Sequence, residues 1–73
     1  MTTIDYHHFA LADALSNAER LVFVTRTKRQ VIDAEFITGH GVIQTELMNL
    51  LKTLGLSPSI QLGNSGVVVC TIE

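Results

Sequence analysis

The spacing of apolar residues along the chain predicts two helices and four strands. Apolar side chains recur every three or four positions in two long segments, which is typical of helices that bury one face. Shorter runs between and around them are rich in β-branched and aromatic residues, which favour strands. In chain order, the pattern predicts a strand at 3–6, a helix at 11–27, a strand at 31–37, a helix at 42–54, and strands at 60–62 and 67–72.

The end of the first predicted helix carries two conflicting patterns. Leu21–Thr25 is dominated by β-branched residues and by itself favours a strand. The same residues continue the helical spacing that begins at Ala14 and Ala18. No glycine, proline or turn cluster separates Arg20 from Leu21, so we predict one continuous helix.

The second predicted helix has a well-defined C-terminus. Gly55 suits the left-handed position that follows many helices, and Leu56 can supply the apolar contact of a Schellman cap. Pro58 prevents the helix from continuing.

The order of these elements predicts a small two-layer α/β sandwich, β-α-β-α-β-β, with a mixed sheet. Strands that alternate with helices imply parallel pairs joined by right-handed crossovers. The turn Gly63–Gly66 predicts an antiparallel hairpin between the last two strands. The uninterrupted apolar run Val67–Ile72 predicts a central strand. We expect residues 1–73 to form a single domain.

Composition limits the class of protein. The chain has 73 residues, of which 47% are hydrophobic, enough for a packed core and too apolar for a disordered tail. No apolar run approaches 18 residues, so no membrane partner is expected. Cys70 is the only cysteine and is predicted to be a buried apolar residue. The absence of a disulfide framework favours the cytoplasm.

Two segments are predicted to meet at the carboxyl ends of the first two strands, where α/β sheets bind ligands. Asp5 and His7 are two positions apart, so they share one face if the strand continues, and His8 then points away. A carboxylate can orient an imidazole for general acid or base catalysis. The alternative is that Asp5 only turns the chain and that the histidines are exposed.

The second segment is the loop formed by Thr38, Gly39, His40 and Gly41, between a predicted strand and a predicted helix. Backbone N–H groups at such a junction, with the positive end of the helix dipole, can bind a phosphate. The alternative is an ordinary tight turn. Asp5, His7 and His40 are also acceptable ligands for Mg²⁺ or Mn²⁺, although no zinc-type spacing is present, so the need for a metal stays open.

The distribution of charge matters more than its sum. The net charge of −2 argues mildly against strong nucleic-acid binding. Arg26, Lys28 and Arg29 nevertheless lie within four positions. They predict either a nucleic-acid-binding patch or a solvated helix end.

Several of these segments resemble motifs of Smr (small MutS-related) domains. Residues 4–7, Ile-Asp-Tyr-His, resemble the opening Leu-Asp-x-His motif of the family, and residues 36–41 resemble its strand followed by Thr-Gly-x-Gly. The Ala- and Leu-containing helix around 14–22 and the glycine-rich turn before the last strand, 63–72, are similar to the corresponding family segments. The resemblance covers nearly the whole chain.

The resemblance implies a fold like that of the C-terminal domain of a bacterial translation initiation factor. It also implies nucleic-acid binding and, in many members, nicking or RNA-cleaving endonuclease activity. Asp5 and His7 would then be the catalytic pair, and residues 38–41 the phosphate-contacting loop. The chain departs from the pattern at His8, where the family has Gly, and at Gln44, where many members have Arg.

Three functions follow from these observations. The first is an endonuclease on DNA or RNA in which Asp5 orients His7, and His7 or His40 transfers a proton. The second is a non-catalytic nucleic-acid-binding module that uses the same loop with the basic cluster. The third is a protein-interaction domain. A larger parent protein and a homo-oligomer both remain open.

Overall fold

The computed structural model describes residues 1–73 and contains all six predicted elements in the predicted order. They are β1 (Thr2–Asp5), α1 (Leu11–Thr27), β2 (Ile32–Ile37), α2 (Val42–Thr53), β3 (Ser59–Ile60) and β4 (Val67–Ile72). No boundary differs from its predicted position by more than two residues. The segment with conflicting patterns is helical, because α1 runs without a break to Thr27.

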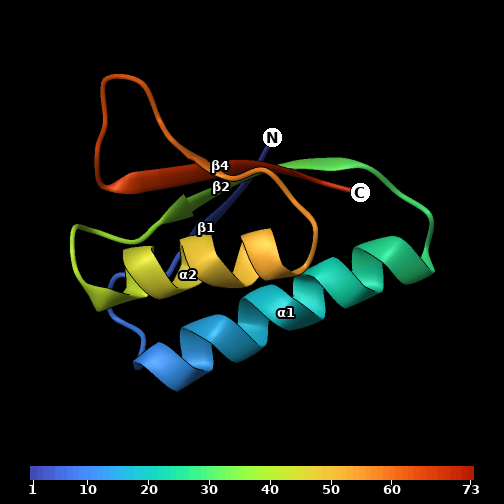
Figure 1. Cartoon of the computed structure of the whole chain (residues 1–73), viewed down its shortest axis with the longest axis horizontal. Coiled ribbons are helices and arrows are strands. Elements are labelled where there is room, and N and C mark those ends of the chain that lie inside the picture. Colours follow the sequence, from blue (N-terminus) through green and yellow to red (C-terminus); the bar gives the residue numbers. More distant parts are fainter.

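The four strands form one mixed sheet in the order β1-β2-β4-β3. β1 pairs parallel with β2, and β4 pairs antiparallel with both β2 and β3. Both helices cover the same face of this sheet (Figure 1). The predicted two-layer α/β sandwich, its antiparallel closing pair and the central position of the last strand are therefore confirmed.

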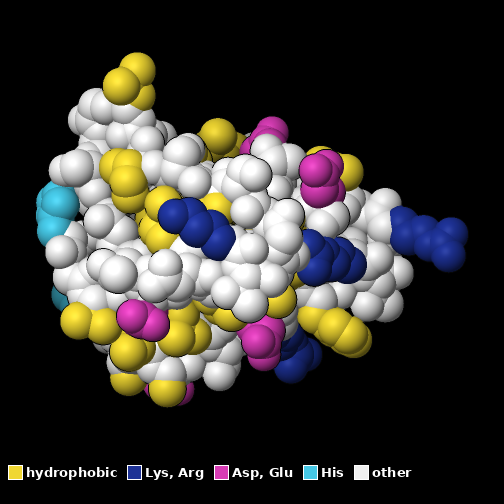
Figure 2. Space-filling model, in the orientation of Figure 1, with side chains coloured by type: hydrophobic (Ala, Val, Ile, Leu, Met, Phe, Trp, Pro, Cys, Tyr) yellow, Lys and Arg dark blue, Asp and Glu magenta, His cyan; other side chains and the backbone are white.

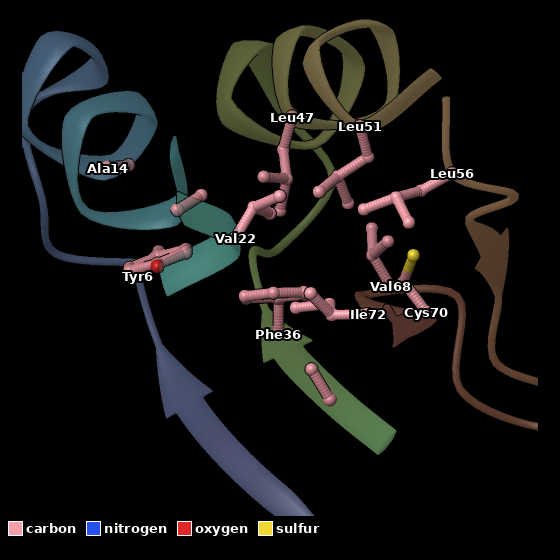
Figure 3. Packing of buried hydrophobic residues seen from close by; sticks show 12 residues of the cluster. Tyr6, Ala14, Val22, Phe36, Leu47, Leu51, Leu56, Val68, Cys70 and Ile72 are labelled. Atoms are coloured by element: carbon pink, nitrogen blue, oxygen red, sulfur yellow. The ribbon is translucent and has the colours of Figure 1, made fainter. Parts of the chain in front are cut away.

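The hydrophobic core lies between the helix layer and the sheet. Leu47 and Leu51 point down from α2 toward Phe36 of β2, and all three side chains are fully buried (Figure 3). Val68 and Ile72 of β4 lie in the same layer. Alternate residues of a strand point to opposite faces, so each strand contributes only every second side chain to this core.

The other face of the sheet is open and acidic. Asp33 and Glu35 alternate with the core residues of β2, and each carboxylate accepts a hydrogen bond across the sheet, from Thr71 at 2.8 Å and from Gln61 at 2.9 Å. These carboxylates make this face of the sheet unfavourable for an anion.

Both helices end in the same backbone arrangement. After α2, Gly55 has a φ of 84°, and the N–H of Leu56 donates to the carbonyl of Leu51 at 2.9 Å, which confirms the predicted Schellman cap. After α1, Arg29 occupies the equivalent position with a φ of 54°. The N–H of Gln30 then donates to the carbonyl of Thr25 at 3.0 Å.

Replacing Arg29 by glycine is expected to stabilise the protein. A left-handed backbone costs a residue with a side chain about 1 kcal/mol, and glycine avoids that cost. We therefore expect Arg29→Gly to raise the free energy of unfolding by about that amount in urea denaturation. Lys28→Gly removes the same charge at a φ of −82° and is the matched control. Equal changes in the two variants would contradict the explanation.

Two further expectations from composition can be compared with the structure. Cys70 is buried as predicted, with 5% of its surface exposed, and this burial raises the pKa of its thiol. Neither helix is long and apolar enough to cross a membrane.

Candidate functional site

The parallel pairing of β1 and β2 brings the two predicted site segments to one edge of the sheet. Asp5 lies opposite Ile37 in the ladder, and the N–H of Tyr6 donates to the carbonyl of Ile37 at 2.8 Å. His7 therefore follows β1 at the same edge where Thr38 follows β2. The predicted meeting of these two segments is confirmed.

Asp5 and His7 form a contact through a turn and not along an extended strand. β1 ends at Asp5, and His7 and His8 lie in a turn. The backbone N–H of His7 donates to Asp5 Oδ1 at 3.0 Å, and the Nδ1 atom of His7 contacts the same oxygen. The bend lets a single carboxylate oxygen of Asp5 reach both the backbone N–H and the ring nitrogen of His7. Asp5 thus stabilises the turn through the backbone of His7 and also orients its imidazole.

Electrostatics at this pair follow from the same contacts. The hydrogen bond from the His7 side chain, followed by that from its backbone, lowers the pKa of the Asp5 carboxyl below its usual value. Asp5 is therefore ionised at neutral pH. Both side chains are substantially exposed, 42% for His7 and 51% for Asp5, so a substrate can reach the imidazole.

The prediction that His8 points away from His7 is wrong. The two imidazole rings lie with their centroids 3.7 Å apart. The alternation that separates neighbouring side chains holds only in an extended strand, and the turn removes it.

The loop after β2 is tied to the turn before β4. Gly39 has a φ of 69°, a conformation that favours glycine. The N–H groups of Thr38 and Gly39 both donate to the carbonyl of Gly66, at 2.9 and 3.0 Å. These two predicted phosphate donors are therefore already hydrogen-bonded. The N–H of His40 takes part in no hydrogen bond of the loop, whereas Gly39 and His40 form a turn that directs the N–H of Gly41 back toward Thr38.

The start of α2 is favourable for an anion. Its N-cap residue, Gly41, supplies no capping side chain, and its first turn contains no acidic residue. The positive end of the helix dipole is therefore neither capped nor neutralised.

Ser65 and Gln44, which sequence reasoning did not assign to the site, hold its loops together. His40 Nε2 lies 2.7 Å from the hydroxyl of Ser65. The side-chain amide of Gln44 donates to the carbonyl of Ser65 at 2.7 Å and to that of Gly39 at 3.0 Å. Gln44 thus links two loops. The sequence singled out Gln44 only as a departure from the pattern of the resembling family, and its place in the first turn of a helix after a glycine-rich loop gave no sign of these two bonds.

These segments surround a shallow hollow of about 300 Å³ at the edge of the sheet. His7 lines it from the β1 side, Gly39 from the loop after β2, and Asn64 from the turn before β4. Glu35 lines the side toward the open sheet face. Glu35 therefore disfavours an anion on its side of the hollow, and His40 and Gly41 do not line it.

The basic cluster lies elsewhere. Arg26, Lys28 and Arg29 precede β2, whereas the loop 38–41 follows it, so the length of the strand, about 20 Å, separates them. Figure 2 shows histidine at one edge of the molecule and the outermost Lys or Arg side chain at the opposite edge. Arg26 donates to the carbonyls of Glu73, at 2.9 Å, and Leu54, at 2.5 Å. The structure therefore does not bring these residues together with His7 and His40.

Asp5, His7 and His40 do not form a metal site with three ligands, because no group of three histidine, cysteine or acidic side chains is arranged to hold an ion. A divalent ion at this edge would depend on phosphate oxygens or water for much of its coordination.

Tyr6 anchors the turn that carries the histidines. Its ring is fully buried and stacks on Phe36 with centroids 5.6 Å apart, and its hydroxyl donates to Asn17 at 2.6 Å. Burial raises the pKa of Tyr6 to about 12, because the phenolate is poorly solvated there.

This shift predicts how stability changes at alkaline pH. The unfolded tyrosine loses its proton near pH 10, and the folded one near pH 12. The stabilisation is therefore complete below pH 10 and is lost as the pH rises toward 12. Tyr6→Phe should lose about 1 kcal/mol at neutral pH with the hydrogen bond to Asn17, and this deficit should shrink above pH 10. Urea denaturation of both proteins from pH 7 to pH 11.5 measures the difference, and a constant deficit would contradict the assignment.

Comparison of the chain with models of known protein families, with curated proteins and with solved structures gives no match.

Proposed function

We propose that this protein is a nucleic-acid-binding, Smr-like domain that cleaves phosphodiester bonds as an endonuclease. The observation that carries the proposal is the meeting of two segments at one edge of the sheet. There His7, in contact with Asp5, lines the same hollow as Gly39 of the loop that leads into α2. A base beside an anion-binding loop can supply the proton transfer and charge stabilisation that phosphodiester hydrolysis uses.

Phosphate binding is assigned to the start of α2. The free N–H group of His40 and the uncapped helix terminus favour an anion at this point. The bonds from Thr38 and Gly39 to Gly66 keep the loop in place before substrate arrives, and Gln44 adds a second link. A loop fixed in advance loses little conformational freedom on binding.

Proton transfer is assigned to the histidines. The Asp5 contact at Nδ1 leaves His7 Nε2 free to accept a proton from water or from a ribose 2′-hydroxyl. The deprotonated oxygen then bonds to phosphorus, and the bond from phosphorus to the leaving oxygen breaks. Donation of a proton to the leaving oxygen is assigned to His40, whose Nε2 contacts the Ser65 hydroxyl on the loop side.

The test is incubation of the purified chain with supercoiled plasmid and with structured RNA, each with and without Mg²⁺ or Mn²⁺. We expect nicked plasmid or shortened RNA from the wild type and not from His7→Ala purified in the same way. Cleavage by both proteins would indicate a contaminant or another site. Binding without cleavage, weakened steeply by added salt, would instead support a non-catalytic binding module.

A separate observation favours a protein-interaction function as the second candidate. A groove of about 830 Å³ runs along α1 and is lined by Phe23, Arg20 and Leu54 among others. Phe23 is 69% exposed, which is unusual for a phenylalanine. Failure of the wild type to bind any nucleic acid at low salt would leave this groove as the functional surface.

A further inference from the structure

The turn between β1 and α1 presents an aromatic ring beside the proposed phosphodiester site. Phe9 is 42% exposed. It follows His7 by two positions, so their Cα atoms lie within about 7 Å of each other. The ring is therefore within reach of a substrate whose phosphate lies at His7.

The position of Phe9 is fixed by contacts on its inner side. Its N–H donates to the carbonyl of Tyr6 at 2.9 Å, and its ring meets the edge of the Tyr6 ring with centroids 5.2 Å apart. Tyr6 in turn stacks on Phe36 in the core. Phe9 is thus held in place from the protein side while part of its surface faces solvent.

The surface around Phe9 is apolar, whereas the proposed phosphate site beside it is polar. Leu11, at the start of α1, is 37% exposed. Figure 2 shows hydrophobic side chains gathered over the first turns of α1, next to the histidine edge. A nucleotide has the same two parts, an anionic phosphate and a flat apolar base.

We infer that Phe9 is a stacking platform for an unpaired base of the nucleic acid bound at His7, and that the protein prefers single-stranded substrates. This inference rests on the proposed nucleic-acid-binding function. An aromatic ring can stack on a base only when the face of that base is free, and in a duplex the neighbouring base pairs cover it. Stacking is tolerant of sequence because every base has such a face.

A direct test uses the absence of tryptophan from the chain. Phe9→Trp places a single fluorophore at the platform, and a stacked base should quench it. We expect saturable quenching on titration with a single-stranded twelve-nucleotide oligonucleotide. We expect little quenching by the same oligonucleotide annealed to its complement, or by inorganic phosphate. Equal quenching by the single strand and the duplex would overturn the inference.

Affinity gives a second measure. Phe9→Leu keeps an apolar side chain of similar size but removes the ring, so it should weaken single-strand binding about 5- to 150-fold. Phe9→Tyr should restore it. Phe23→Leu makes the same change at another exposed ring, which lies in the second half of α1 and away from Phe9. This variant should bind single strands like the wild type. Unchanged affinity in Phe9→Leu would also overturn the inference.

The outcomes separate this inference from the proposed function. Cleavage that does not depend on Phe9 would support the proposed nuclease function and contradict the stacking role of Phe9. Single-strand binding that depends on Phe9, without cleavage, would support the platform and remove the catalytic assignment. Failure of the wild type to bind any nucleic acid would overturn both.

Discussion

Replacing His7 by alanine is expected to lower the rate of nucleic-acid cleavage by about 10²- to 10⁴-fold, the usual contribution of a positioned general base. The imidazole is the only group at this edge that contacts a carboxylate at one nitrogen and leaves the other free. Its loss removes the proposed proton acceptor, while the N–H of His40 and the start of α2, which we propose bind the phosphate, remain. We therefore expect the loss in kcat and a much smaller change in affinity.

Two further variants show whether the loss has this cause. Asp5→Asn keeps the size of the side chain but removes its charge, so it should give an intermediate loss and alter the pH dependence of the rate. His8→Ala removes the neighbouring exposed imidazole and should retain the wild-type rate constant. Because His7 is exposed, His7→Ala should unfold at the same urea concentration as the wild type. Equal losses of activity in the variants at positions 7 and 8 would contradict the assignment.

Replacing Phe36 by alanine is expected to lower the free energy of unfolding by about 3–5 kcal/mol. The ring is fully buried between Tyr6 of the first turn and the leucines of α2 (Figure 3). A chain of this length has about 4–11 kcal/mol of stability in total. The variant should therefore be partly or largely unfolded at 37 °C and should also lose the site, because Tyr6 loses the ring on which it stacks.

Thermal and urea denaturation followed by circular dichroism measure this effect. Phe23→Ala is the matched control, since it makes the same chemical change at a ring that is 69% exposed. We expect that variant to lie within about 0.5 kcal/mol of the wild type. A loss below about 1 kcal/mol in Phe36→Ala would show that the core can close around the missing ring.

Local sequence determined the elements of this fold and most of their ends. The spacing of apolar residues located both helices, including the part of α1 whose composition favours a strand. Gly55 and Leu56 located the end of α2, because a left-handed residue and an apolar contact are local requirements. The parallel pairing of β1 with β2 also followed from the order of elements, since a strand, a helix and a second strand usually form one right-handed unit.

That pairing was enough to predict that the Asp5–His7 segment and the loop 38–41 would meet. It was not enough to predict their conformations. The turn at His7 depends on one oxygen of Asp5 reaching two groups, and this bend placed His8 beside His7.

Only the tertiary structure decided which loop groups are free and which residues share the site. Thr38 and Gly39 donate to Gly66, which is 27 positions or more away in the chain, and Gln44 reaches Ser65 across 21 positions. The basic cluster was placed about a strand length from the loop, because it enters β2 where the loop leaves it. These facts depend on how β4 pairs with β2, and contacts between distant segments leave no periodic pattern in the sequence.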